Sequence, residues 1–225
     1  MLPLPKQIEL QNQFQFHIIA AVFPPINFFE DLVDAAEMQT LFEIESITNE
    51  RIRLEVGDIF LIANEDCVSG PGSSVVMAAF THIGKPSRFT DGSYGIYYAG
   101  LSQETAIKET VYHREQFLQA TNEAAGEITM CIYQGTLAKP LHDLCPQKFH
   151  KLHHPNNYSE PQVFAKKLRK SKSWGVIYNS VRHAGGKCVA AFRPPAVSIP
   201  KQAAYLRYVW NGEKITTVFE IKLVE

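Results

Sequence analysis

Short apolar runs separated by turn residues constrain the fold of this chain most strongly. They are rich in β-branched and aromatic residues, as buried strands are. They cover residues 95–100 (GIYYAG), 127–135 (EITMCIYQG), 174–178 (WGVIY) and 187–192 (KCVAAF). Between the first two lies the stretch 103–120, which has apolar residues near helical spacing, Ser102 as an N-cap and Glu104 in its first turn. Strands that outnumber interspersed helices predict an α/β or α+β domain built around a mixed sheet.

The two ends of the chain predict an extension and a hairpin. Residues 1–24 are polar and then apolar. We therefore expect residues 1–50 to form an N-terminal extension packed on a single domain over residues 51–225. Near the C-terminus, residues 205–224 predict a hairpin that turns at Asn211-Gly212.

Five other segments have weaker local signals. We expect a short helix capped by Asn27, two short strands over residues 51–63, a loop over 69–74, a polar loop over 150–158 and a helix that begins near Ser159 and runs through Leu168. The Gly/Pro/Ser loop SGPGSS lacks the lysine and the spacing of a nucleotide-binding P-loop, so it is interpreted as a turn.

The composition argues against several classes of protein. Hydrophobic residues make up 45% and charged residues 20% of the chain, so a packed core is expected and wholesale disorder is not. The formal net charge of −1 argues against direct nucleic-acid binding, which usually needs a clear basic excess. No run approaches the roughly 20 apolar residues of a membrane helix, and the N-terminus lacks the pattern of a signal peptide. We therefore expect a cytoplasmic protein without membrane contact.

The cysteines and histidines match no recognised disulfide or metal pattern. The cysteines lie far apart without paired spacing, at Cys67, Cys131, Cys145 and Cys188. We expect four free thiols. Three histidines stand close together, at His150, His153 and His154. No cysteine or carboxylate completes a ligand set with them, so no metal site is expected.

Two longer stretches carry the chemistry. SRFTDGSYGIYYAGLSQETAIKETVYH (87–113) combines an Arg-aromatic pair, a Gly-containing turn, a strand that ends in Tyr-Ala and a helix that carries a Glu. WGVIYNSVRHAGGKCVAAFRPP (174–195) has a strand that runs into Asn-Ser-Val-Arg. In this order they resemble the two core motifs of the RES family. The family is named after an Arg, a Glu and a Ser, which match Arg88, Glu109 and Ser180.

The resemblance implies a fold and an activity. The domain over residues 51–225 would be a RES domain, with the family fold over residues 50–215. That fold is related to ADP-ribosyltransferases, and its activity degrades NAD. Many members are toxins that an Xre-type helix-turn-helix antitoxin holds in check, so NAD and such an antitoxin are the expected partners. NAD would be the substrate, and no cofactor is expected.

The residues of the two motifs suit this chemistry. Cleavage of the nicotinamide–ribose bond leaves an oxocarbenium-like ribose, which the Glu109 carboxylate would stabilise. A guanidinium matches the oxygens of a pyrophosphate, so Arg88 and also Arg182 would bind the phosphates. Tyr98 would stack on the nicotinamide or the ribose. Ser180 would donate to a phosphate or orient Glu109, since no base that would activate it as a nucleophile is identified.

The same residues also have plain structural interpretations. Outside the ordered motifs, Glu109 would be a solvated helix residue and Arg88 a surface charge. Tyr98 would be a packing residue and Ser180 a turn residue, both without contact to a ligand.

Three further features have no assigned role. His82 and His113 would either line the site or be hydrogen-bonded polar groups. Many RES proteins carry an additional basic residue upstream of the Arg88 motif, and no counterpart can be assigned within residues 60–72.

The reaction is open between several outcomes. Water or phosphate could attack the ribose, which would make the protein an NAD glycohydrolase or a phosphorylase. The alternatives are an ADP-ribosyltransferase that modifies a protein and a catalytically inactive NAD-binding module.

Overall fold

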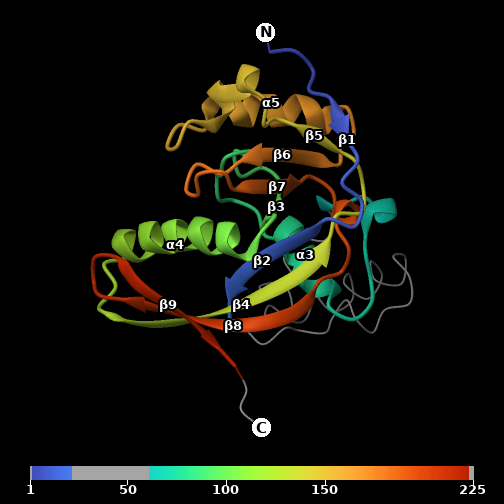
Figure 1. Cartoon of the computed structure of the whole chain (residues 1–225). Helices are drawn as coiled ribbons and strands as arrows, with labels where there is room; N and C mark the ends of the chain where they lie inside the picture. Colours follow the sequence, from blue (N-terminus) through green and yellow to red (C-terminus); the bar gives the residue numbers. More distant parts are fainter. Residues whose placement is uncertain (1, 22–60, 223–225) are drawn as a thin grey trace.

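One large mixed sheet forms the centre of the molecule. The structure is a computed structural model that describes residues 2–21 and 61–222. The described strands follow the order β1-β5-β6-β7-β3-β2-β4-β8-β9 (Figure 1). They are β1 (Gln7–Ile8), β2 (Phe14–Ala20), β3 (Tyr97–Gly100), β4 (Gly126–Thr136), β5 (Leu141–Asp143), β6 (Gly175–Asn179), β7 (Lys187–Ala191), β8 (Lys201–Trp210) and β9 (Ile215–Ile221). Among these, β5 and β6 run parallel and the other neighbours antiparallel.

Helices cover both faces of the sheet (Figure 1). The α-helices in the described residues are α3 (Ser73–Thr81), α4 (Gln103–Ala120) and α5 (Ser159–Lys170). In the same residues, three short 3-10 helices join the larger elements, at η3 (Asn64–Asp66), η4 (Gln147–His153) and η5 (Pro194–Ala196). This arrangement confirms the predicted fold class, a single mixed α/β domain.

The core contacts show which helices share a face. Ala106 of α4 belongs to one core cluster, with residues of β2 and β4. Ala165 of α5 belongs to a second cluster, with residues of β6 and β7 that include Cys188. The strand register places both clusters on the same face. On the opposite face, Met77 of α3 packs with Tyr97 of β3. Because α4 and α5 lie on one face, their side chains and connecting loops can meet above β6 and β7.

Most of the local predictions are confirmed. The runs predicted as strands correspond to β3, β4, β6 and β7, and the helix predicted near Ser159 is α5. The predicted capping of α4 is also present, since the Ser102 hydroxyl accepts a hydrogen bond from the Thr105 amide at 3.2 Å. Among the described helices, none has the length and apolar character needed to cross a membrane.

The N-terminal segment is more than an addition to the outside of the domain. β2 lies between β3 and β4 and pairs with β4 from Phe14 to Ala20. Alternate residues of β2 pack into clusters on the two faces of the sheet. The described part of residues 1–50 therefore contains an inner strand, β2, and a short edge strand, β1. The predicted helix after Asn27 and most of the strands predicted over 51–63 lie outside the described residues, and residues 61–63 are not in a strand. A domain boundary at residue 50 stays a prediction.

Three local predictions were incomplete. The loop predicted over 69–74 ends at Gly72, and α3 begins at Ser73. This helix is apolar on most sides because it is buried, so it lacks the polar stripe that marks a surface helix. The polar loop predicted over 150–158 begins inside η4. The C-terminal hairpin is present, but its loop has four residues and is closed by a hydrogen bond from the Asn211 amide to the Lys214 carbonyl.

Close packing at Gly95 predicts a strong effect of a methyl group there. A Cβ atom at this position would lie 2.3 Å from the Ala79 carbonyl oxygen and 2.4 Å from the Phe80 Cα atom of α3. We expect Gly95→Ala to lower the free energy of unfolding by about 3 kcal/mol, because the backbone of α3 must move. The control is Gly126→Ala, where the nearest atom is 3.9 Å away. Denaturant unfolding of both variants checks this, and equal stability of the two would contradict the packing argument.

Candidate functional site

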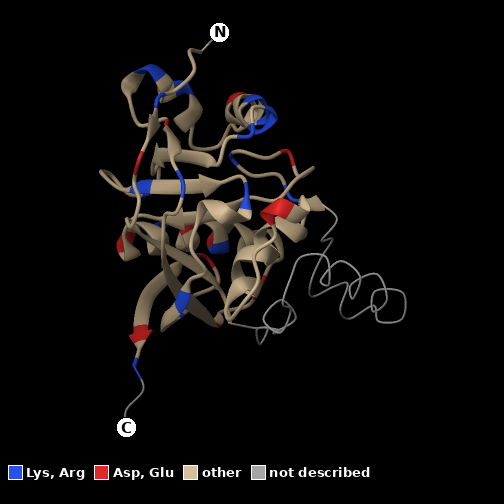
Figure 2. Ribbon diagram, turned by 90° about the vertical axis from the view of Figure 1, so that its right-hand side faces the viewer, with Lys and Arg blue, Asp and Glu red and all other residues tan. Residues whose placement is uncertain are grey.

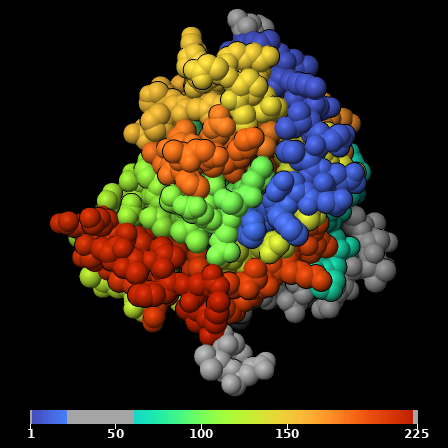
Figure 3. Space-filling model, viewed as in Figure 1, coloured from blue at the N-terminus to red at the C-terminus, as the bar shows by residue number. Residues whose placement is uncertain are grey.

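The two motifs meet where α4 contacts the loop after β6, and in the space-filling view the green segment of α4 lies directly against the orange segment (Figure 3). Ser180 Oγ donates a hydrogen bond to Glu109 Oε1 at 2.5 Å. Ser180 Oγ also accepts hydrogen bonds from the backbone amides of Arg182, at 3.1 Å, and His183, at 2.9 Å. Because both lone pairs of the hydroxyl are occupied, its proton is directed to the carboxylate. The structure thus brings together two of the three residues that name the resemblance.

The 180–186 loop is fixed against the first turn of α4. The Ser180 amide donates to the Gly186 carbonyl at 2.9 Å, and His183 Nδ1 lies 2.9 Å from Thr105 Oγ1. A Cβ atom on Gly186 would lie only 2.6 Å from the same Thr105 oxygen. The glycine therefore permits the close approach of loop and helix that places Ser180 beside Glu109.

Two neutral groups, a thiol and a tyrosine hydroxyl, lie beside the Glu109 carboxylate. The buried Cys188 thiol donates to Glu109 Oε1 at a distance of 3.7 Å. Burial raises the pKa of the Cys188 thiol, and it also raises the pKa of the Tyr178 hydroxyl. Both groups therefore stay protonated beside the carboxylate. Within the described part of the chain, Glu109 Oε2 accepts no hydrogen bond, so it can accept one from a ligand.

Arg88 is a buried cation held by carbonyl groups and aromatic rings. Its Nη1 atom donates to the carbonyl oxygens of Leu152, at 3.2 Å, and His154, at 2.9 Å. Its guanidinium carbon lies 4.8 Å from the centre of the Tyr158 ring and 6.0 Å from that of Tyr178. Among the described residues it has no carboxylate partner, and its Nε and Nη2 atoms have no acceptor. A buried charge without a counter-charge is costly, and an anionic ligand would relieve that cost.

Tyr98 supports the turn that carries Arg88. Its hydroxyl lies 2.7 Å from Ser87 Oγ and accepts a hydrogen bond from the Phe89 amide at 3.1 Å. Burial raises the pKa of Tyr98, so the hydroxyl stays protonated. The predicted stacking of Tyr98 on a ligand stays a prediction, while the contacts present in the structure are those of a supporting residue.

Arg182 connects the 180–186 loop to the segment that holds Arg88. Its guanidinium carbon lies 3.4 Å from the centre of the Tyr112 ring, one turn after Glu109 on α4. Its Nη2 atom donates to the Pro155 carbonyl at 2.7 Å and to Asn156 Oδ1 at 3.2 Å. The predicted phosphate contact of Arg182 is untested, and the structure shows a bridge between two parts of the site.

His113 is about one turn after Glu109 on α4 and is affected by the charges of the site. Burial lowers the pKa of His113, the negative charge of Glu109 raises it, and the positive charges of Arg182 and Arg88 lower it. His82, by contrast, follows α3 on the opposite face of the sheet and is not brought to the site.

His153 is a site residue that the sequence did not reveal as such. The Asn179 amide donates to His153 Nε2 at 3.2 Å, and the Nδ1 atom lies 3.1 Å from the Phe149 carbonyl oxygen. Because Nε2 accepts this hydrogen bond, Nδ1 carries the proton and the ring is neutral. Burial lowers the pKa of His153, which also favours the neutral ring. The residue therefore holds the end of β6, next to Ser180. Tyr178 and Tyr158 were also missed, although Tyr178 lies in β6 only two residues before Ser180.

The site is recognised neither by a cluster of metal ligands among the described residues nor by the two cavities described below. Within residues 2–21 and 61–222, no three His, Cys, Asp or Glu side chains are grouped as metal ligands would be. Two cavities, of about 600 and 310 Å³, lie elsewhere, one beside α5 and one beside η3. The candidate site rests on the contacts of its residues instead.

The match to a family model agrees with the motifs, and two individual proteins are similar to this chain. The sequence is 26% identical over 214 residues to the uncharacterised protein y4oC of Sinorhizobium fredii, which covers 95% of this chain and 89% of that protein. The crystal structure of the M. tuberculosis MbcT–MbcA toxin–antitoxin complex aligns with a TM-score of 0.41 and 10% identity, over 94% of this chain and 86% of that chain. A TM-score of this size supports no transfer of residues or partners. The RES domain family model matches residues 67–211, well over half of the chain, and the chain therefore belongs to the RES domain family.

Proposed function

We propose that the protein consumes NAD by cleaving the bond between nicotinamide and ribose. One observation carries this proposal. The Glu109 carboxylate, which Ser180 orients, and the buried Arg88 guanidinium both act electrostatically on His113, and within the described residues neither forms an ion pair. NAD requires both charges, since its pyrophosphate is anionic and its ribose becomes cationic during cleavage. Membership of the RES family supports the same substrate.

Glu109 would stabilise the transition state. Positive charge develops on the ribose as nicotinamide leaves, and a fixed carboxylate among neutral groups interacts with it more strongly than one in water. Ser180 would act by orienting this carboxylate. Its oxygen already accepts two backbone N–H groups and donates to Glu109, which leaves it poorly suited to attack the substrate.

Arg88 would bind the pyrophosphate. Its Nε and Nη2 groups have no acceptor among the described residues, and a guanidinium matches two phosphate oxygens at once. Arg182 would add a second positive charge near the pyrophosphate. It and Arg88 donate to neighbouring backbone carbonyls of the same segment. In this proposal NAD is the substrate and no cofactor is required.

Two further questions belong to the same proposal. The attacking group is water in a glycohydrolase and phosphate in a phosphorylase, whereas an ADP-ribosyltransferase would pass the sugar to a protein. The proposed biological role is that of a toxin, with an Xre-type antitoxin as its partner, as the family resemblance implies. An inactive NAD-binding module is the alternative that requires no catalysis.

The first prediction is that the purified protein depletes NAD and releases nicotinamide. Chromatography of the products, with and without added phosphate and an acceptor protein, distinguishes free ADP-ribose, phosphorylated ADP-ribose and modified protein. Expression in a bacterial host should also lower cellular NAD and slow growth. Intact NAD after long incubation with a folded sample at high concentration would refute the proposal.

The second prediction concerns Glu109→Gln. The amide keeps the size and can still accept the Ser180 hydrogen bond, but it carries no charge. We expect kcat to fall by about 10²–10³-fold while NAD affinity changes little, because the charge matters mainly in the transition state. Glu104→Gln on the same helix is the control, since Glu104 is exposed and pairs with Lys108. Turnover and calorimetric binding are measured for both, and normal turnover by Glu109→Gln would exclude the mechanism.

The third prediction concerns Arg88. Arg88→Ala should raise KM for NAD by roughly 10- to 150-fold, the effect of losing a charge-assisted hydrogen bond, and Arg88→Lys should restore part of it. Arg207→Ala removes an exposed arginine paired with Glu127 and should leave KM unchanged. Steady-state kinetics on folded samples test this. Equal kcat/KM in Arg88→Ala and the wild type would remove Arg88 from the binding site.

A further inference from the structure

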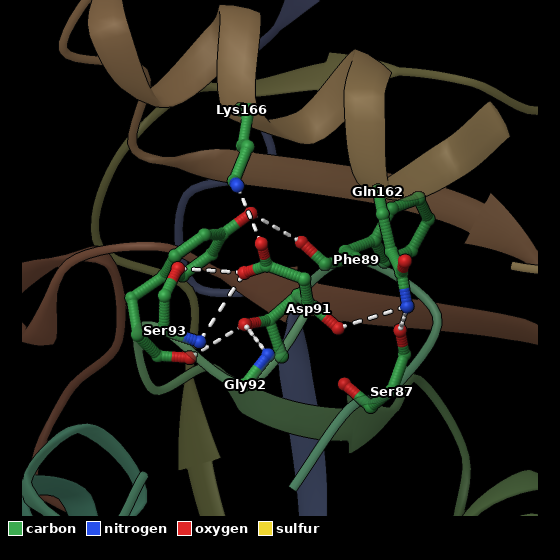
Figure 4. A network of polar contacts seen from close by, with 9 residues as sticks. Ser87, Phe89, Asp91, Gly92, Ser93, Gln162 and Lys166 are labelled. Atoms are coloured by element: carbon green, nitrogen blue, oxygen red, sulfur yellow. Dashed lines mark hydrogen bonds and ion pairs between the residues drawn. The ribbon is translucent and has the colours of Figure 1, made fainter. Parts of the chain in front are cut away.

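The short turn that carries Arg88 is fastened by one side chain of α5. The Ser87 amide donates to the Thr90 carbonyl at 2.8 Å and closes the turn. Gln162 Nε2 donates to the carbonyl oxygens of both Ser87, at 2.9 Å, and Thr90, at 3.0 Å (Figure 4). A side-chain amide has two N–H donors, which these two carbonyls satisfy. Gln162 therefore holds both ends of the turn, with Arg88 and Phe89 between them.

Gln162 is the middle member of a stripe along α5. Gln162 and Lys166 are four residues apart and so share one side of the helix, and Tyr158, the N-cap of α5, precedes Gln162 by the same spacing. The Tyr158 ring lies 4.8 Å from the Arg88 guanidinium, and Lys166 forms an ion pair with Asp91 just beyond the turn (Figure 4). Both partners of this ion pair are exposed, and Figure 2 shows the basic positions of α5 on the outer side of the helix. Exposed ion pairs contribute little, so the half-buried amide is the main attachment of the turn to α5.

We propose that Gln162 is a positioning residue for NAD binding. It holds the backbone around Arg88, so that the guanidinium stays beside the Tyr158 ring with Nε and Nη2 available to the pyrophosphate. Gln162 acts through the turn and does not touch the substrate. This inference rests on the proposed function, because it assigns the held guanidinium to NAD. It also explains why an amide stands here, since a carboxylate would face two carbonyl oxygens.

Two variants and a matched control test the proposal. Gln162→Met removes both hydrogen bonds and keeps the length of the side chain, and Gln162→Glu keeps the size but replaces the donors with acceptors. Gln119→Met is the control, because Gln119 Nε2 also donates to a backbone carbonyl, that of Glu213 at 2.8 Å, away from the Arg88 turn. Amide hydrogen exchange of residues 87–92 should become at least about 10-fold faster in both Gln162 variants, since two hydrogen bonds of modest strength are lost. It should not change in Gln119→Met.

Kinetics then separate positioning from a general loss of structure. Gln162→Met should raise KM for NAD by about 10-fold with little change in kcat, and it should have no further effect on KM in an Arg88→Ala background. Unchanged exchange of residues 87–92, or an equal rise of KM with and without Arg88, would overturn the proposal. If the wild type neither binds nor cleaves NAD, the proposed function fails, and with it the role of Gln162 in NAD binding. Faster exchange would then show only that Gln162 holds the turn.

Discussion

The pairing of β3 with β7 is the contact on which the site depends. Gly100, at the end of β3, lies opposite Cys188 of β7. β3 leads into α4, and β7 follows the loop that begins at Ser180, so the register sets the helix and the loop side by side. Glu109, about two turns into α4, then meets the Ser180 hydroxyl. A shift of one residue in this register would turn Cys188 to the opposite face and separate the two motifs.

The opposite charges of the site are held by neutral groups rather than by each other. Glu109 accepts hydrogen bonds from a hydroxyl and a thiol, and Arg88 donates to carbonyl groups and lies beside aromatic rings. Within the described residues, neither forms an ion pair. An ion pair between them would satisfy both charges and leave little to bind a ligand. In the proposed reaction, separate support would keep each charge available, one for an anionic pyrophosphate and the other for a ribose that becomes cationic.

The sequence predicted the elements whose signals are local. The cap and spacing of α4 and the apolar runs of β3, β4, β6 and β7 need no distant partner to be recognised. β2 was missed as an inner strand because its place depends on pairing with β4, far away in the sequence. α3 was missed because it is buried on most sides. The motifs named Arg88, Glu109 and Ser180, but His153 and Gln162 enter only through tertiary contacts, which local patterns do not contain.

α4 is positioned from both halves of the sheet. Thr110, next to Glu109, has its hydroxyl 2.7 Å from that of Tyr208 on β8, and Glu115 accepts a hydrogen bond from the Ile215 amide of β9 at 2.7 Å. On its other side, the helix contacts the loop after β6 through Ser180. Shared contacts of this kind remove the freedom of a long surface helix to slide along the sheet. The carboxylate can therefore keep a fixed direction, which electrostatic stabilisation of a transition state requires.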